Sequence, residues 1–255
     1  MNRTADVVIV GAGVIGSATA FELAKRGYKT LNIDKLPASG YGSTSNSCAI
    51  VRAHYSTWDG VAMAYEGFFY WDDWNKYLEV EDERGMAKYM KTGSIMFMLK
   101  GADHSKKSLN LFKEIGVEHE IWDLETLKKK MPIYSHDSYN GTSRPDEDDS
   151  FFDKSGDQIE GAVWTPGSGY VSDPQLATHN LQVATEAKGG EFLFDAEITE
   201  IRQSNGQIQG VTLKSGEQID CKVLVNVAGP HSFIINQMAG VEDDMNIKTK
   251  ALRHE

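Results

Sequence analysis

The chain has 255 residues, enough for one large domain or two modest ones, each with a hydrophobic core. Lys and Arg number 26 against 37 Asp and Glu, and the resulting net charge of -11 disfavours nonspecific binding to nucleic acid or to anionic membranes. We therefore expect a small-molecule ligand and no nucleic acid partner.

The two cysteines, Cys48 and Cys221, lie far apart and form neither a CxxC pair nor a Cys/His spacing. This pattern predicts neither a disulfide framework nor a metal site, and it fits a cytoplasmic location. The apolar run near the N-terminus is only a few residues long and leads straight into a glycine motif. We therefore expect no signal peptide and no membrane span.

The first elements predict a βαβ unit. The run "ADVVIV" at 5–10 is rich in β-branched residues, as is typical of a strand buried on both faces of a parallel sheet. A helix is expected over 17–27, with Gly27 at its C-terminal end. A second strand over 29–34 ends in Asp34.

A G-x-G-x-x-G motif, made by Gly11, Gly13 and Gly16, lies between the first strand and the helix. Such glycines permit a tight turn, a close approach of backbone amides to a pyrophosphate, and packing of helix on strand. Asp34 could then accept hydrogen bonds from ribose hydroxyls. The motif alone is a weak signal, and a turn without a ligand is the alternative. The order of strand, helix, strand and acid favours a dinucleotide site.

Apolar residues then recur at helical spacing over 59–78, which predicts one face of a core helix rather than an aromatic cage for a ligand. These residues are Val61, Ala64, Phe68, Trp71 and Leu78. A strand is expected over 92–100, a helix ending at Gly116, and a short helix with Asp123 as N-cap.

The segment 134–160 is polar and acidic and shows no convincing periodicity, so we expect a surface loop. Its "DEDD" run at 146–149 is interpreted as solvated rather than as a metal site. Two short β segments follow at 161–173. Asp173 then caps a helix that runs to Gly189.

Short strands over 191–227, with Asn-Gly at 205–206 and Ser-Gly at 215–216, predict an antiparallel meander. The last run, "CKVLVNVAG" at 221–229, predicts another buried strand. A nicotinamide dehydrogenase would usually continue with further βα units, whereas here a segment of small residues follows the second strand. This interruption favours FAD over NAD.

Taken together, these residues resemble the FAD-dependent amine and amino-acid oxidoreductases, the family that includes D-amino-acid oxidase, glycine oxidase and sarcosine oxidase. The likeness rests on four segments: "DVVIVGAGVIGSATAFELAKRG" with "LNIDK", "GSTSNSCAIVR", "GYVSDPQLATHNLQVATEAKGGEF" and "VLVNVAGPHS". The segment ending "IVRAHYS" resembles in particular the catalytic (beta) subunit of multi-subunit sarcosine oxidase and related N-methyl amino-acid dehydrogenases.

The resemblance implies an α/β fold in which a FAD-binding Rossmann-like domain, of the glutathione-reductase type, is interleaved with an antiparallel-sheet substrate domain. We expect residues 1–85 and 173–235 in the FAD-binding domain, and 86–172 and 236–255 in an incomplete substrate domain. Members of the family continue beyond the end of this sequence. Either a shortened chain, or a second polypeptide that supplies the C-terminal half, would account for the difference.

The resemblance also implies the contacts with the cofactor. The pyrophosphate would be held by Gly11, Ala12, Gly13, Val14, Ile15 and Gly16, and the adenosine would lie at Asp34 and Lys35. The diphosphate and ribityl chain would be wrapped by Ser43, Thr44, Ser45 and Asn46. Cys48, Ala49 and Ile50 would run beneath the isoalloxazine. Ile198 would contact the adenine through its backbone, and Ala228 and Gly229 would close over the nucleotide.

Arg52 matches the family arginine that pairs with the substrate carboxylate, and it is the one catalytic residue that the resemblance assigns. A salt bridge to a nearby acid is the alternative. His54 and Tyr55 could line the same pocket, but core packing is favoured for both. No histidine that could tether a flavin occurs at 42–51, and Cys48 is interpreted as a small buried residue rather than a thioether, so we expect dissociable FAD.

The implied reaction is oxidation of the C–N bond of a small amino acid or N-methylated amino acid, with hydride transfer to flavin N5 and hydrolysis of the resulting imine. Oxygen or a carrier protein would accept the electrons. One alternative is oxidation of a 2-hydroxy acid or glycerol phosphate on the same fold. Another is a non-catalytic FAD-binding subunit, or a fragment, completed by a partner chain.

Overall fold

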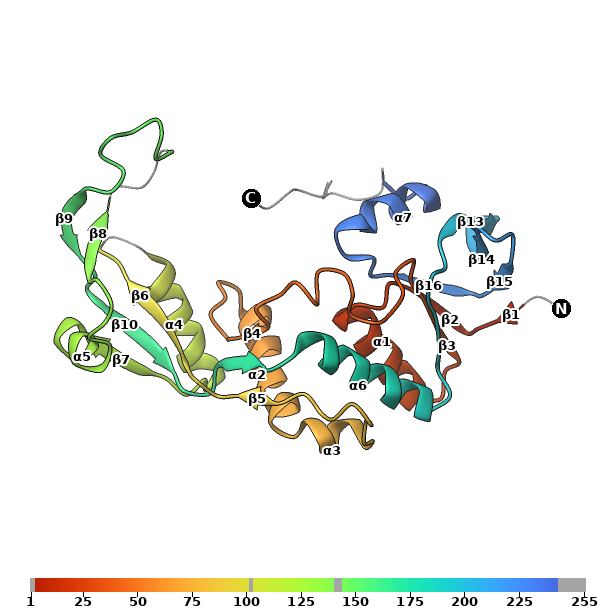
Figure 1. Cartoon of the computed structure of the whole chain (residues 1–255), viewed down its shortest axis with the longest axis horizontal. Helices are drawn as coiled ribbons and strands as arrows, with labels where there is room; N and C mark the ends of the chain where they lie inside the picture. Colours follow the sequence, from red (N-terminus) through yellow and green to blue (C-terminus); the bar gives the residue numbers. More distant parts are fainter. Residues whose placement is uncertain (1–2, 101–102, 140–143, 243–255) are drawn as a thin grey trace. The chain divides into compact units, whose positions relative to one another are not determined.

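The computed structural model of the chain describes residues 3–100, 103–139 and 144–242 (Figure 1). The chain forms two compact units, which we call unit 1 and unit 2. Unit 1 contains Met1–Ala49, Asp73–Lys88 and Val171–Glu255, and unit 2 contains Ile50–Asp72 and Tyr89–Tyr170. Among the described residues, no helix is long and apolar enough to cross a membrane.

The two units divide the chain differently from the predicted domains at four places. Residues 50–72 lie in unit 2, and residues 86–88, 171–172 and 236–242 lie in unit 1. The roles assigned to the two domains stay predictions. Residues 243–255 of the predicted substrate domain lie outside the described residues.

The centre of unit 1 is a four-stranded parallel sheet in the order β12–β3–β2–β16. Every residue of β2 is buried, which confirms the prediction of a first strand covered on both faces, and every residue of β3 is buried as well. The strands are β2 (Val7–Val10), β3 (Thr30–Ile33), β12 (Glu191–Leu193) and β16 (Val223–Asn226).

The prediction that the last strand is buried was wrong. In β16, Val223 is 49% exposed and the other three residues are only partly buried. The physical reason is position, because β16 is an edge strand of this sheet and pairs only with β2 among the described residues.

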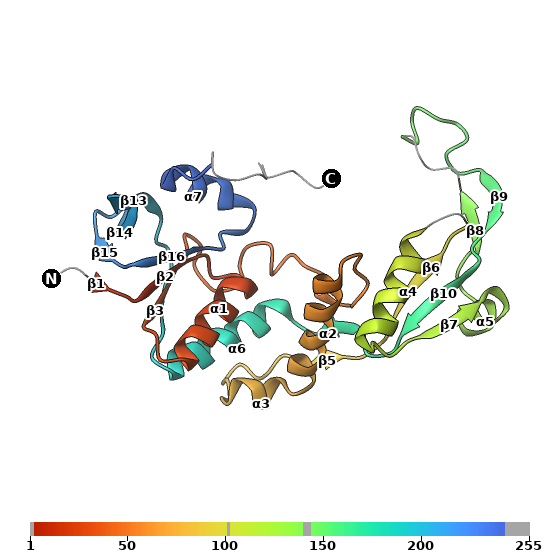
Figure 2. The ribbon, with the colours of Figure 1, turned by 180° about the vertical axis from the view of Figure 1, so that it is seen from behind.

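Two helices, α1 (Val14–Lys25) and α6 (Pro174–Ala187), lie side by side in unit 1, as both views of the chain show (Figure 2). The predicted cap of α6 is confirmed, since Asp173 Oδ1 accepts a hydrogen bond of 2.9 Å from Leu176 N. Gly27 and Gly189 follow the two helices with φ of +87° each, a left-handed conformation that favours glycine at a helix end.

The antiparallel meander predicted over 191–227 is confirmed for its three middle strands, at 198–220. It was wrong for β12 and β16, which pair in parallel with β3 and β2. Asn205 and Gly206 both have positive φ and join β13 to β14 as a two-residue hairpin. Apolar residues of this sheet pack against those of the parallel sheet in one core. The order of strands in this sheet is β1 (Arg3–Thr4), β15 (Gln218–Asp220), β14 (Gln207–Leu213) and β13 (Ile198–Ser204). Two helical elements, η1 (Gly229–His231) and α7 (Ser232–Ala239), follow β16 along the chain.

Unit 2 is built on an antiparallel sheet in the order β6–β10–β7. A buried cluster that includes Phe68, Phe112 and Val163 packs helices against it. The predicted N-cap at Asp123 is confirmed, because its Oδ1 accepts a hydrogen bond of 2.8 Å from Thr126 N. The elements are β6 (Ser94–Met98), β7 (Glu120–Asp123), β10 (Gly161–Thr165), α2 (Trp58–Asp72), α4 (Asp103–Ile115) and α5 (Leu124–Lys130), with a small sheet of β4 (Ile50–Val51), β11 (Gly169–Val171) and β5 (Tyr89–Met90).

The single helix predicted over 59–78 was wrong in its second half. Helix α2 ends at Asp72, and a separate helix, α3 (Trp74–Leu78), follows in unit 1. At about 100° per residue, Trp74 would lie two-thirds of a turn away from Phe68 on a continuous helix. The break lets Phe68 be buried in unit 2 while Trp74 is buried in unit 1.

The loop predicted over 134–160 contains a two-stranded antiparallel ribbon, β8 (Asp137–Tyr139) and β9 (Lys154–Gln158), and residues 140–143 lie outside the described residues. The residues of the two strands, Asp-Ser-Tyr and Lys-Ser-Gly-Asp-Gln, are nearly all polar, so there is no apolar alternation for a sequence pattern to detect. Asp146–Asp149 forms a turn, and no cluster of three or more His, Cys, Asp or Glu side chains that could hold a metal occurs in the described part of the chain.

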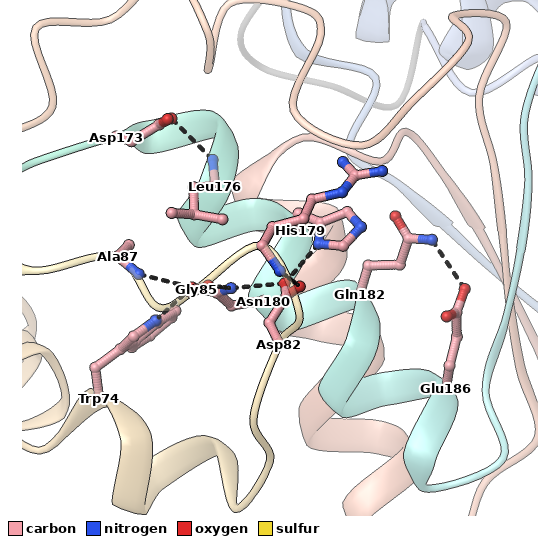
Figure 3. Close-up of polar contacts among 11 residues, drawn as sticks. Trp74, Asp82, Gly85, Ala87, Asp173, Leu176, His179, Asn180, Gln182 and Glu186 are labelled. Carbon is pink, nitrogen blue, oxygen red and sulfur yellow. Dashed lines mark hydrogen bonds and ion pairs between the residues drawn. The ribbon is translucent and has the colours of Figure 1, made fainter.

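A buried polar network centred on Asn180 ties α6 to the segment before it in unit 1 (Figure 3). The Asn180 oxygen accepts hydrogen bonds from Trp74 Nε1 (3.3 Å) and Ala87 N (3.0 Å). Its nitrogen donates to Asp82 Oδ2 (2.8 Å) and Gly85 O (2.9 Å). The amide therefore uses its full hydrogen-bonding capacity on α3 and the loop that follows it.

We expect Asn180→Ala to lower the free energy of unfolding by about 2–4 kcal/mol, because several buried polar groups would lose their partners at once. Gln182→Ala is the matched control, since Gln182 lies on the same helix, is half-buried, and its side chain bonds Glu186 alone among the described residues (Figure 3). Urea denaturation followed by circular dichroism measures both values. Equal effects of the two substitutions would contradict the account.

The carboxylate of Asp82 makes this network sensitive to acid. Burial alone would raise the pKa of Asp82, but hydrogen bonds from Arg84 N, His179 and Asn180 hold this pKa below its usual value. Since the pKa is lower in the folded chain, the carboxylate stabilises the fold above its unfolded-state pKa of about 3.9, and this stabilisation is lost as pH falls through the folded-state pKa.

We therefore expect the difference in free energy of unfolding between the wild-type chain and Asp82→Asn to be largest near neutral pH and to shrink below about pH 4. Urea denaturation at a series of pH values measures the difference, and other acidic groups cancel because both proteins contain them. A difference that stays constant down to about pH 3 would show that Asp82 is not the titrating group.

Candidate functional site

The turn between β2 and α1 has no room for side chains at two of its glycines. Gly11 has φ of +113°, and a Cβ built on it would lie 2.5 Å from Val227 O. A Cβ on Gly16 would lie 2.1 Å from Gly11 O. Close backbone contacts within unit 1 therefore explain why only glycine fits at these two positions, as predicted.

Asp34 is fixed beside this turn at the carboxyl end of β3. Its Oδ2 accepts a hydrogen bond from Ala12 N (2.8 Å), and its Oδ1 accepts one from Leu36 N (2.9 Å). A carboxylate has about four acceptor positions, so two remain for hydroxyl groups of a ligand. Asp34 is half-buried, and Lys35 beside it is exposed.

Thr44 connects the small-residue segment to the start of α1. Its Oγ1 accepts a hydrogen bond of 3.1 Å from Val14 N, the first amide of the helix. A Cβ on Gly13 would lie 3.3 Å from the same oxygen. Thr44 therefore marks the place where a polar acceptor meets the positive end of the helix.

The remaining predicted residues of this segment have exposed or half-buried side chains. Ser45 Oγ and Asn46 Nδ2 both donate to Gly42 O, at 3.1 and 3.0 Å. The interpretation of Cys48 as a small buried residue was wrong, because its side chain is exposed. The exposed or half-buried residues are Val14, Ile15, Ser43, Ser45, Asn46, Cys48, Ala49 and Ile50.

Two further segments of unit 1 reach the turn. Ala196 N donates to Asp34 O (3.0 Å), which brings the chain just before Ile198 to the end of β3. The Ile198 side chain itself is buried in the core, so only its backbone could face a ligand. On the other side, Ala228 Cα lies 3.3 Å from a Cβ built on Gly11, and Gly229 follows it.

Asn32 and Ser39 also belong to this region, and neither was predicted from the sequence. Asn32 Nδ2 donates to Gly11 O (3.2 Å) and Gly16 O (3.1 Å), and these two hydrogen bonds fix the positions of the two glycines relative to each other. The signal was present, since Asn32 is a polar residue within an apolar strand. The Ser39 hydroxyl is buried and has no hydrogen-bond partner among the described residues, next to Gly40, whose N donates to Ala12 O (2.8 Å).

Arg52 lies in unit 2, directly after β4. Its side chain is exposed, its Nη1 donates to His54 O (3.0 Å), and its guanidinium carbon lies 5.5 Å from the centre of the Tyr55 ring. No carboxylate pairs with it among the described residues. Core packing is confirmed for His54, which is buried, but was wrong for Tyr55, which is 44% exposed beside the guanidinium.

These observations fit a bound dinucleotide in unit 1. The turn brings backbone, rather than side chains, to the start of α1, and Asp34 has acceptor capacity left. The unpartnered Ser39 hydroxyl lies next to the same turn. Residues 11–16, 34 and 44 are brought together by hydrogen bonds or backbone contacts, and residue 228 by its contact with Gly11.

Comparison with known proteins gives a family and a fold. Residues 6–255 match the family described as "DAO: FAD dependent oxidoreductase". Monomeric sarcosine oxidase of a Bacillus species is 29% identical over 93% of this chain and 55% of its own length. Sarcosine oxidase subunit beta of Rhodobacter capsulatus is 27% identical over 92% and 52%, and glycerol 3-phosphate dehydrogenase of Caloramator mitchellensis is 25% identical over 91% and 43%.

Solved structures agree on the fold. L-proline dehydrogenase from P. horikoshii has a TM-score of 0.76 at 22% identity and covers 95% of this chain and 57% of its own. Glycine oxidase from Geobacillus kaustophilus has a TM-score of 0.71 at 20% identity and covers 94% and 59%. The predicted α/β fold is therefore confirmed. This chain spans about half the length of these proteins.

We expect Gly16→Ala to lower the free energy of unfolding by about 3 kcal/mol or more, because the added methyl group would meet backbone that cannot move without shifting α1. Gly67→Ala is the matched control, since Gly67 also lies within a helix, α2, and has nothing within 4 Å of its built Cβ. That substitution should stabilise the chain by about 0.5–1 kcal/mol. Urea denaturation measures both, and effects of the same sign would contradict the role of Gly16.

Proposed function

We propose that this chain, which belongs to the family of FAD-dependent oxidoreductases (DAO), binds FAD through unit 1 and forms part of an enzyme that oxidises the C–N bond of a small amino acid or N-methylated amino acid. The family resemblance predicted from the sequence is confirmed. The observation that carries the proposal is the glycine turn with Asp34 beside it, in a chain whose family depends on FAD.

The roles of the cofactor residues follow from their chemistry. The backbone of residues 11–16 would hold the diphosphate at the positive end of α1, where a negative charge is stabilised. Asp34 would accept hydrogen bonds from the ribose, and Thr44 and the buried Ser39 hydroxyl supply polar groups near the same turn. The remaining predicted contacts, residues 35, 43, 45–46, 48–50, 198 and 228–229, stay part of the proposal.

Bound FAD supplies the acceptor for a hydride equivalent from the carbon next to the substrate nitrogen. The chain's own contribution is to hold the substrate, and Arg52 is the residue suited to this. Its guanidinium is exposed and lacks a carboxylate partner among the described residues, so it can bind a substrate carboxylate through two parallel hydrogen bonds. Anchoring the carboxylate fixes the carbon that reacts, and the oxidised product would be an imine that water hydrolyses.

Two relatives favour the amine substrate, and one favours an alternative. The names of the Bacillus and Rhodobacter proteins refer to sarcosine, an N-methylated amino acid, whereas the Caloramator protein is named for glycerol 3-phosphate. Arg52 could bind either anion. Oxidation of a 2-hydroxy acid or of glycerol phosphate is therefore the second candidate function.

The relatives are about twice as long as this chain, so the complete site is proposed to include residues that the chain does not contain. One of them is named a subunit, which supports a partner polypeptide for this chain as well, and that partner is proposed as one source of the additional residues. A non-catalytic FAD-binding subunit is the corresponding alternative. Oxygen or a carrier protein is proposed as the electron acceptor. A cytoplasmic location is proposed because both cysteines of the chain are free.

The test is to load the chain with FAD, add one substrate at a time without oxygen, and record the loss of visible flavin absorbance. N-methyl amino acids should bleach the flavin, and hydroxy acids and glycerol 3-phosphate should not. Bleaching by the latter group would favour the alternative substrates. A yellow chain that no substrate bleaches would favour the non-catalytic subunit.

We expect Arg52→Met to weaken binding of a carboxylate substrate by roughly tenfold to a hundredfold, because a charge-assisted bidentate contact is lost. Arg144→Met is the matched control in unit 2, where Arg144 is exposed before the turn at 146–149. Titration of the flavin spectrum with substrate measures the dissociation constants. Equal affinities of the Arg52→Met and Arg144→Met variants would rule out the assignment of Arg52.

A further inference from the structure

A chain of contacts in unit 2 connects the exposed guanidinium of Arg52 to the interior of the β6–β10–β7 sheet. We propose that His54 is a positioning residue for Arg52, held in place by a buried cluster of hydroxyl groups from Ser94, Thr165 and Ser168, which we call the hydroxyl cluster. The proposal rests on the proposed function of Arg52 as the group that binds the substrate carboxylate.

The first contact fixes the guanidinium to its own turn. Arg52 Nη1 donates to the carbonyl oxygen of His54 at 3.0 Å, and the guanidinium carbon lies 5.5 Å from the centre of the Tyr55 ring. An exposed arginine otherwise samples many rotamers, and ordering them on binding costs free energy. The position of the His54 carbonyl therefore limits where the guanidinium can lie.

The second contact fixes His54 itself. His54 is only 6% exposed, and its Nε2 lies 3.0 Å from Thr165 Oγ1. Its ring also packs against Phe112, with 5.6 Å between the ring centres. The imidazole is therefore held at its face by Phe112 and at its edge by Thr165. Because the side chain cannot move, the backbone carbonyl of His54 is held in one position.

The third set of contacts fixes Thr165. This residue is fully buried, and its Oγ1 lies 2.9 Å from Ser94 Oγ and 2.9 Å from Ser168 Oγ, in addition to His54. The same Oγ1 also lies 3.4 Å from Ser94 O, to which it can donate, so the donor and both acceptor positions of the hydroxyl have partners. Thr165 is therefore held in one rotamer by partners on three sides.

The hydroxyl cluster is anchored to the sheet. Thr165 is the last residue of β10 and pairs directly with Ser94, the first residue of β6. Ser168 N donates to Thr165 O (3.2 Å), and Ser168 O accepts from Gly93 N (2.8 Å). The end of the antiparallel sheet thus fixes the position of Thr165, and Thr165 fixes the imidazole of His54. The carbonyl of His54 in turn fixes the guanidinium of Arg52, and a precise anion site requires such support.

The experiment compares Thr165→Val with Thr185→Val in the FAD-loaded chain. Both threonines are fully buried, but Thr185 lies in unit 1, and within the described part of the chain its hydroxyl bonds only Leu181 O of its own helix. Two quantities are measured by NMR. The first is the rotation rate of the Arg52 guanidinium about its Nε–Cζ bond, with the resonance assigned from Arg52→Lys. The second is the ratio of the dissociation constants of acetamide and acetate, which reports recognition of the carboxylate charge.

We expect Thr165→Val to speed guanidinium rotation and to weaken acetate binding by roughly tenfold while acetamide binding stays unchanged. Thr185→Val should change neither quantity, even where it lowers stability. His54→Leu should behave like Thr165→Val. His54→Gln should recover part of the acetate affinity, because its amide can reach the place of Nε2. Ser168→Ala, which removes a single hydroxyl of the cluster, replaces Thr165→Val should that variant fail to fold.

The outcomes separate the inference from the proposed function. If Arg52→Met abolishes the preference for acetate but Thr165→Val and His54→Leu match the wild-type chain in both quantities, the inference is overturned and the role of Arg52 stands. If the wild-type chain shows no preference for acetate over acetamide, the proposed role of Arg52 fails, and the inference fails with it.

Discussion

The contact between Gly16 and the backbone of Gly11 is the constraint on which the rest of unit 1 depends. No side chain fits between the helix and the turn, and Asn32 donates to the carbonyls of both glycines. This contact brings the first amide of α1 to Thr44 and the amide of Ala12 to Asp34. A polar ligand at this point meets backbone donors, a helix end and a carboxylate that are all already in place, which lowers the free-energy cost of ordering them on binding.

Each of the two units contains a buried polar group whose hydrogen bonds hold two segments of the chain together. In unit 1, the buried amide of Asn180 ties α6 to the loop at 82–87 through three hydrogen bonds and to Trp74 of α3 through a fourth. In unit 2, the hydroxyl cluster ties the turn that contains Arg52 to a sheet. In both cases a fully satisfied buried polar group fixes one arrangement, because any other would leave donors or acceptors unpaired away from water.

Local signals in the sequence predicted most of the elements, and signals that depend on tertiary neighbours failed. The glycine at 27, the aspartate at 173 and the Asn-Gly pair at 205 act through their own backbone conformation or nearest amides, so their effects could be read directly. The helix break near residue 73 could not, because periodicity predicts that Phe68 and Leu78 are buried but not that they are buried in different units. The exposure of β16 likewise depends on its place at a sheet edge.

The candidate site shows the same division. Gly11, Gly16 and Asp34 were predicted from spacing alone, and their contacts agree with the expected geometry. Asn32 could have been found as a polar residue in an apolar strand, whereas the unpartnered hydroxyl of Ser39 depends on packing that no pattern reports. The support of Arg52 by Thr165 joins residues far apart in sequence, and only the fold brings them together.

Titration of the chain with FAD and with FMN, followed by flavin fluorescence, tests the central claim most directly. FMN lacks the adenosine that Asp34 and the glycine turn are proposed to hold. The account predicts that a single FAD binds per chain and that FMN binds at least roughly tenfold more weakly, since the charge-assisted contacts at the turn are lost. A folded chain that binds neither flavin, or that binds both equally, would contradict it.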